Sequence, residues 1–272
     1  MPMTINTNVT SINSQRSLAS TQNLLNTSMQ RLSSGLRINS AKDDAAGMAI
    51  ATRMDTQVRG QAVGIRNAND AISMSQTAEG AVSKVSDMLQ RMRELAVQSA
   101  NATNTTDDRA NLNAEFEQLG AEVTRTALNT KFNGQTVIGS QAGGITYQVG
   151  AETSDQVTVT TTNVATITST VTSGNITSAE NASSAMANID TALTAINTQR
   201  AIYGAVQNRF DNIISTLQLA NENTAAARGR IVDADFAAET ANLSRAQILQ
   251  QAGTAMVAQA NQLPQQVLSL LR

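Results

Sequence analysis

The fold is decided by residues 186–217, which read MANIDTALTAINTQRAIYGAVQNRFDNIISTL. Apolar side chains in this stretch recur at steps of three and four residues, apart from one step of seven that spans the polar pair Gln199 and Arg200. Such spacing places the apolar side chains in one seam along a helix. A helix of about forty residues extends roughly 60 Å, so the stretch predicts a long rod. The seam consists of Met186, Ile189, Leu193, Ile196, Tyr203, Val206, Phe210, Ile213 and Leu217.

Two shorter seams of the same kind precede the long one. Burying each large apolar side chain contributes about 1.5–3 kcal/mol, so seams of this length can hold helices together. We therefore expect the three segments to pack against one another. The first short seam contains Val82, Val85, Leu89, Met92 and Ala96, and the second contains Leu112, Phe116, Leu119 and Val123.

Both ends of the chain carry an apolar stripe that has no core of its own to enter. Each stripe therefore needs the other stripe, or another copy of the chain, as its partner. Gly253 and Ala260 lie between the large residues of the C-terminal stripe. The residues predicted to form these terminal seams are Leu25, Met29, Leu32 and Leu36 near the N-terminus, and Leu249, Met256, Leu263, Val267 and Leu270 near the C-terminus.

The pattern changes between about residues 131 and 175, where apolar residues alternate with polar ones amid Gly and Thr. Alternation of this kind predicts short strands, and Gly143-Gly144 fits a turn between them, so we expect one or two β-hairpins. We interpret the Thr-rich stretch 158–177 as a β-rich surface turn, with an O-modified loop as the alternative. The alternating residues are Ile145, Tyr147, Val149, Val157 and Val159.

Acidic residues precede several of the predicted helices. Asp43-Asp44, Asp107-Asp108 and the pair Asp233 and Asp235 each come directly before a periodic segment. Carboxylates at such positions cap the first turn of a helix, and we prefer this interpretation to catalytic carboxylates. Thr177 followed by Glu180 fits a capping box before the longest helix.

The predicted fold is therefore mainly α: an elongated antiparallel helical bundle or coiled coil with a small β-hairpin region. Gly60 and Gly64 lie inside a helical pattern. Because glycine has no side chain, we expect these two positions to allow a neighbouring helix to approach closely.

The composition excludes several kinds of chemistry. The 272 residues include no Cys and no His, which excludes a disulfide framework, a thiolate nucleophile, an imidazole base and the usual zinc sites. We expect no catalytic residue, no metal and no cofactor. The net charge of −2 indicates no basic patch for nucleic acid and permits association of like copies. No apolar run reaches the roughly 20 residues that span a bilayer, and the first residues do not form a secretory signal.

Three stretches resemble the signature blocks of bacterial flagellins. They are RLSSGLRINSAKDDAAG at 31–47, QRMRELAVQSAN at 90–101 and SRAQILQQAGTAMVAQANQLPQQVLSLLR at 244–272. The resemblance covers most of the chain and is to a minimal flagellin without extra variable outer domains.

This resemblance implies a non-enzymatic structural subunit that self-assembles into the bacterial flagellar filament for motility. It implies a terminal coiled-coil polymerisation domain of residues 1–44 plus 234–272, and an α/β rod of residues 45–233. It also implies secretion by flagellar type III export, a chaperone that binds the C-terminal segment, and contacts with the filament cap and hook-junction proteins. The expected location is the extracellular filament.

The resemblance further implies recognition by Toll-like receptor 5 of vertebrate hosts. The positions that match the receptor-binding surface of flagellins are Arg91, Leu95 and Glu115. The periodicity supports this surface in part, because it leaves Arg91 outside the seam. The alternative is that the two charged residues are solvated and that Leu95 widens the seam.

Three other classes of protein fit the sequence less well than a flagellin does. A hook–filament junction protein shares flagellin-like ends, but the match over the full length argues against it. A metallopeptidase of the kind inserted in some flagellins requires a His-Glu-x-x-His motif, and this chain has no His. A generic coiled-coil scaffold or a needle-type secretion component explains the seams but not the three blocks.

Overall fold

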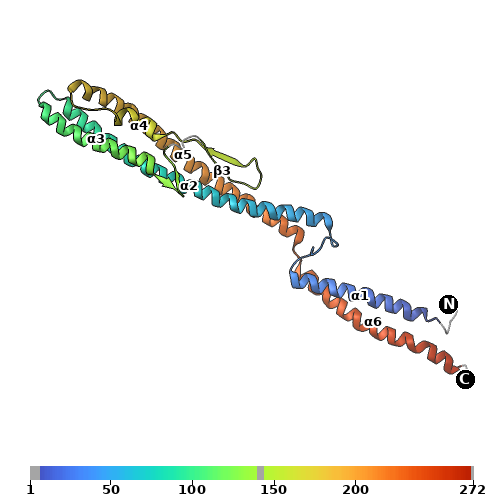
Figure 1. The fold of residues 1–272 in the computed structure, drawn as a ribbon. Coiled ribbons are helices and arrows are strands. Elements are labelled where there is room, and N and C mark those ends of the chain that lie inside the picture. Colours follow the sequence, from blue (N-terminus) through green and yellow to red (C-terminus); the bar gives the residue numbers. More distant parts are fainter. Residues whose placement is uncertain (1–6, 140–143, 271–272) are drawn as a thin grey trace. The chain divides into compact units, whose positions relative to one another are not determined.

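The computed structural model describes residues 7–139 and 144–270, and these residues are mainly α-helical (Figure 1). The contacts between Cα atoms divide the chain into two compact units. Unit 1 comprises residues 1–56 and 223–272, and unit 2 comprises residues 57–222. The predicted fold class is confirmed. The elements are α1 (Val9–Ser34), α2 (Ala45–Ala100), α3 (Thr106–Asn129), β1 (Lys131–Phe132), β2 (Gln135–Thr136), β3 (Ile145–Gln148), β4 (Gln156–Val159), α4 (Val164–Thr172), α5 (Ala179–Val232) and α6 (Phe236–Leu270).

The core of unit 2 lies where α2, α3, α4 and α5 pack together. The predicted seams supply it: Leu89 and Met92 of α2 and Ile189 of α5 are fully buried. Phe116 of α3 is 1% exposed and joins the same cluster. The three periodic segments therefore pack against one another as their spacing predicts.

A second, smaller core joins the longer hairpin to α2 and α5. Val157 and Val159 of β4 pack with Ala68 of α2 and Phe210 of α5. The ring of Tyr147 meets that of Phe210 edge to face, with 5.7 Å between the ring centroids. This geometry is favourable for aromatic pairs, and it fixes the hairpin on the helices.

The β region differs from the expectation at its C-terminal end. It contains two antiparallel hairpins, β1–β2 and β3–β4, and the Thr-rich stretch then forms helix α4. Asn163 begins this helix, because its side-chain oxygen accepts a hydrogen bond from the amide of Ala165 at 2.9 Å. Val164, Thr168 and Val171 are buried at helical spacing, so packing overrides the preference of Thr for strands.

The turns of the two hairpins also differ from the sequence pattern. Asn133 and Gly134 connect β1 to β2 with φ values of 50° and 80°, as a two-residue hairpin turn requires. Gly144 directly precedes β3, and Gly143 lies outside the described residues, so the predicted Gly143-Gly144 turn stays a prediction. Residues 149–155 form the turn between β3 and β4.

Polar side chains cap the helices close to the predicted positions. Asp44 accepts from the amide of Gly47 at 2.8 Å, and Asp235 accepts from that of Ala237 at 2.9 Å. Thr105 and Asp108 form a capping box at the start of α3. The hydroxyl of Ser178 begins α5 by accepting from the amide of Asn181 at 3.1 Å. The predicted cap at Thr177 was therefore one residue too early.

The two glycines of α2 accept the hairpin loop rather than a helix. A Cβ atom at Gly60 would lie 2.5 Å from the Cβ of Ala151, and one at Gly64 would overlap the carbonyl oxygen of Val149. The side-chain amide of Asn67 donates to the carbonyl of Gln148 at 2.8 Å beside them. The predicted close approach is correct, but the expected partner was wrong.

We predict that Gly64→Ala destabilises the protein by about 1–3 kcal/mol, because the loop backbone has to move away from the new methyl group. Gly80 provides a matched control on the same helix, since nothing lies within 4 Å of a Cβ atom placed there. Gly80→Ala is expected to stabilise by roughly 0.5–1 kcal/mol. Urea unfolding followed by circular dichroism measures both, and equal effects of the two substitutions would contradict this account of Gly64.

Candidate functional site

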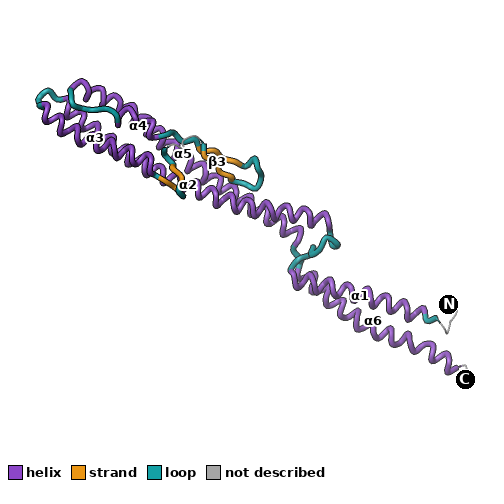
Figure 2. Tube along the Cα trace, viewed as in Figure 1, coloured by secondary structure: helices purple, strands orange, loops and turns teal. Residues whose placement is uncertain are grey.

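Within unit 1, helices α1 and α6 lie side by side (Figure 2), and small residues form much of the contact between them. Ala246 and Ala260 of α6 are each 3% exposed. A Cβ atom at Gly253 would lie 3.1 Å from Leu18 of α1. Leu25 of α1 is the one large apolar side chain that is buried among the described side chains of this pair. The contact therefore contains little apolar side-chain volume.

Polar groups complete the pairing of the two helices. The amide of Asn8 donates to the carbonyl of Ala260 at 2.7 Å, and the hydroxyl of Ser11 donates to the side chain of Asn261 at 2.7 Å. The amide of Gln250 donates to Gln22 at 2.8 Å. These hydrogen bonds fix the register of α1 against α6 and contribute modestly to stability, about 0.5–1.5 kcal/mol each.

Several of the predicted seam residues point away from this contact. Met29 is 51% exposed, Leu249 is 47% exposed and Met256 is 60% exposed. Leu32 and Leu36 are half-buried, and Leu263, Val267 and Leu270 belong to the part of α6 whose backbone alone is described. The exposed members share their helices with further large apolar side chains that the sequence analysis did not select. These are Val9, Ile12 and Leu24 of α1 and Phe236 and Ile248 of α6, each 56–66% exposed.

A backbone clasp holds the end of α1 against the start of α6. Gly35 adopts a left-handed φ of 71°, which ends α1. The chain then pairs with the end of α5: the amide of Arg37 donates to the carbonyl of Val232 at 2.7 Å, and the amide of Ala234 donates to that of Gly35 at 2.9 Å. Beside the clasp, Arg31 lies 3.9 Å from the carboxylate of Glu239.

The three residues of the predicted receptor surface differ in exposure. Arg91 of α2 donates hydrogen bonds to Glu115 of α3 and to Glu94, both at 2.9 Å. These hydrogen bonds raise the pKa of Arg91 above its ordinary value. Leu95 is 1% exposed and belongs to the core. Of the three, Arg91 and Glu115 therefore present atoms at the surface, and Leu95 packs beneath it.

A second ion pair joins α2 to α5. The guanidinium of Arg93 makes two hydrogen bonds to Asp190, at 2.6 and 3.2 Å. These bonds hold the pKa of Asp190 below its ordinary value. The pair was not identified from the sequence, because its partners lie 97 positions apart and neither belongs to a recognisable motif.

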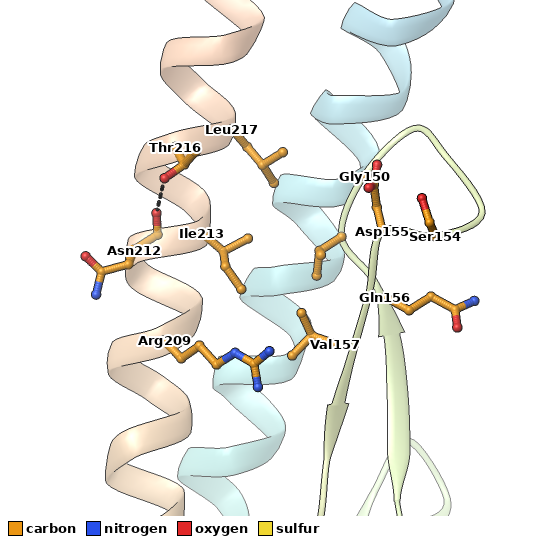
Figure 3. Close-up of a pocket in the computed structure, with 11 residues that line it drawn as sticks. Gly150, Ser154, Asp155, Gln156, Val157, Arg209, Asn212, Ile213, Thr216 and Leu217 are labelled. Atoms are coloured by element: carbon orange, nitrogen blue, oxygen red, sulfur yellow. Dashed lines mark hydrogen bonds between the residues drawn. The ribbon is translucent and has the colours of Figure 1, made fainter.

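A groove of about 530 Å³ lies between the β3–β4 hairpin and α5. Figure 3 shows Val157 on the hairpin facing Ile213 and Leu217 on the helix. The groove also contains Asp155, whose carboxylate accepts from the amide of Glu152 at 3.1 Å. The walls therefore combine apolar side chains with polar ones such as Arg209 and Thr216, and the carboxylate of Asp155 serves the hairpin turn.

Residues 7–139 and 144–270 contain no group of three or more His, Cys, Asp or Glu side chains that could hold a metal ion. None of the helices in those ranges is long and apolar enough to cross a membrane.

Family models match both helical ends of the chain. Residues 5–141 match the bacterial flagellin N-terminal helical region, and residues 186–271 match the bacterial flagellin C-terminal helical region. This chain belongs to the bacterial flagellin family. It is a subunit of the flagellar filament, a structural protein that self-assembles.

Flagellins from distant bacteria align with the chain from end to end. It is 45% identical to a flagellin of Halalkalibacterium halodurans over 272 residues, covering 99% of this chain and 100% of that one. Flagellin FlaB2 of Treponema pallidum is 40% identical, with 99% and 100% covered. Flagellin A of Vibrio cholerae is 34% identical, with all of both chains covered in an alignment of 379 residues. Since that alignment exceeds the 272 residues present here, this chain is a short, minimal flagellin.

Solved structures agree with the family assignment. The crystal structure of Bacillus cereus flagellin has a TM-score of 0.52 and 32% identity, covering 60% of this chain and 94% of that one. A putative flagellar hook-associated protein from Vibrio parahaemolyticus has a TM-score of 0.59 over 70% of this chain and 100% of its own. At 13% identity, the second similarity concerns the fold alone.

The Arg93–Asp190 pair predicts that the stability of the folded protein depends on pH. The pKa of Asp190 is lowered in the folded state, so the pair stabilises the protein above the unfolded pKa of about 3.9 and loses this effect as pH falls through the folded pKa. Wild type should therefore exceed Asp190→Asn in urea midpoint near neutral pH, and the difference should shrink toward about pH 3 and in high salt. A difference that is constant across this pH range would contradict the assigned pairing.

Proposed function

We propose that the terminal helices form the polymerisation domain of the filament subunit, comprising residues 1–44 and 234–272, and that residues 45–233 form its rod. The observation that carries this proposal is the exposure of large apolar side chains on α1 and α6. Met29, Leu249 and Met256 are each about half exposed or more. Large apolar side chains that are exposed together on paired helices favour a protein–protein contact.

The packing of α1 on α6 supports a partner outside the monomer. Small residues and hydrogen bonds hold the pair together, whereas each large side chain left outside offers about 1.5–3 kcal/mol on burial. An isolated pair of helices gains little from its small contact, so these helices become stable when copies stack. Contacts between different patches that do not close a ring generate an open helical fibre.

We extend the proposal to export and location. The subunit leaves the cell by the flagellar type III route, with a chaperone bound to its C-terminal segment, and becomes part of an extracellular filament. There it meets the filament cap and hook-junction proteins. Because the chain lacks Cys and His, we assign it a structural role and no catalytic activity.

Removing the terminal helices tests the polymerisation domain. We expect intact protein seeded with filament fragments to form long filaments by electron microscopy, and a version lacking residues 1–44 and 234–272 to form none. Circular dichroism of the truncated version controls for its folding. Filaments from a folded truncated protein would refute the proposed role of the termini, and an intact chain that stays monomeric with seeds would favour a junction or scaffold role.

We also propose that the surface around Arg91 is a ligand of vertebrate Toll-like receptor 5. Arg91 and Glu115 lie exposed on adjacent helices and bond to each other, so they offer a receptor both charges at one place. Leu95 supports the same surface from below, because it is buried directly in the helical turn that follows Arg91. The resemblance to flagellins is the basis for proposing this receptor, and the exposure of the Arg91–Glu115 pair supports this position for the binding surface.

Arg91→Ala should weaken receptor activation by roughly tenfold, since removing a group that hydrogen-bonds across an interface costs about 1–3 kcal/mol. Arg125→Ala is the matched control, because Arg125 forms a comparable exposed pair with Glu122 on α3. A reporter assay in cells that express the receptor measures both proteins. Equal activity of Arg91→Ala and wild type would remove Arg91 from the proposed surface.

A further inference from the structure

Methionine is the only source of sulfur in this protein, which has 10 Met and no Cys. The structure separates the described methionines by their exposure. Met74 and Met92 lie in the core of unit 2, at 3% and 0% exposure. Met29 of α1 and Met256 of α6 are 51% and 60% exposed. Side chains of one chemical type, on apolar stripes that look alike in the sequence, therefore differ in their access to solvent.

We propose that Met29 and Met256 are oxidation sites, at which a peroxide converts the thioether to a sulfoxide and so blocks incorporation of the subunit into the filament. In this step the sulfur loses two electrons and gains one oxygen atom from the peroxide, the O–O bond breaks, and water leaves when the oxidant is hydrogen peroxide. This inference rests on the proposed function of the terminal helices.

The physical basis is the polarity of the product. A thioether is apolar and flexible and packs well in helix contacts, whereas a sulfoxide is a strong hydrogen-bond acceptor. Met29 and Met256 lie on the apolar faces that the filament covers. Burying an acceptor there without a donor opposes each contact that a new subunit makes. Methionine sulfoxide reductases reverse the change, so the block is reversible.

The exposure of each methionine predicts which methionines are oxidised, and whether the free or the assembled subunit reacts. The core methionines Met74 and Met92 are inaccessible, so unit 2 keeps its fold while the terminal helices react. Met48, which is 38% exposed on α2, reacts as well but lies outside the predicted seams. Within a filament Met29 and Met256 are covered, so the free subunit is the sensitive form.

The first experiment exposes free full-length subunit to limited hydrogen peroxide, so that part of each methionine reacts, and then adds filament seeds. Filaments are separated from unassembled protein, and mass spectrometry measures sulfoxide at each methionine in both fractions. We expect sulfoxide at residues 29 and 256 to be enriched roughly tenfold in the unassembled fraction, and sulfoxide at residue 48 to be distributed equally. Equal distribution at residues 29 and 256 overturns the proposal.

The second experiment compares variants, each with its own untreated sample. We expect peroxide to lower the assembly of wild type and of Met48→Leu, and treatment with a methionine sulfoxide reductase to restore it. Met29→Leu/Met256→Leu should lose no assembly on treatment, whatever its untreated level. A double variant that stays as sensitive as wild type overturns the proposal. Failure of untreated wild type to assemble on seeds would instead refute the proposed function on which this inference rests.

Discussion

The apolar contact between α2 and α5 is the interaction on which unit 2 depends. Leu89 and Met92 on one helix and Ile189 and Ile196 on the other are fully buried, and α3, α4 and the hairpins pack onto this pair. The polar residue Gln199, which interrupts the apolar seam of α5, has a structural role. Gln199 is 1% exposed, and its carbonyl accepts from the amide of Thr162 at 3.1 Å. This hydrogen bond ties the segment after β4 to α5.

In the terminal helices, by contrast, large apolar side chains stay exposed instead of entering a core. A subunit that folds completely on itself has no apolar surface left with which to join its neighbours, whereas one that exposes too much aggregates. The α1–α6 pair meets both demands by placing small residues such as Ala246 and Ala260 inside and large ones such as Leu249 and Met256 outside. The inside contact aligns the helices, and in our proposal the outside faces supply the free energy of assembly.

Periodicity predicted the long helices and the core of unit 2, because an apolar side chain every three or four residues specifies a helix face without reference to the rest of the chain. It did not determine which face of α6 meets α1. Leu249 and Met256 share a seven-residue spacing with Ala246, Gly253 and Ala260, and the sequence pattern favours the larger residues. The Thr-rich helix α4 was also missed, since its stability comes from burial of Val164 and Val171 and not from local propensity.

The Arg91–Glu115 and Arg31–Glu239 ion pairs differ in how deeply their side chains are buried. The Arg91–Glu115 pair has both side chains about half exposed, so water competes with each partner and the pair adds little to stability. Such charges are free to exchange partners when a receptor binds. The Glu239 side chain beside the clasp is only 10% exposed, and removing Arg31 would leave a buried carboxylate without a counter-charge. The Arg31–Glu239 pair is therefore suited to holding the register of α1 and α6, whereas receptor recognition by the exposed Arg91–Glu115 pair remains our proposal.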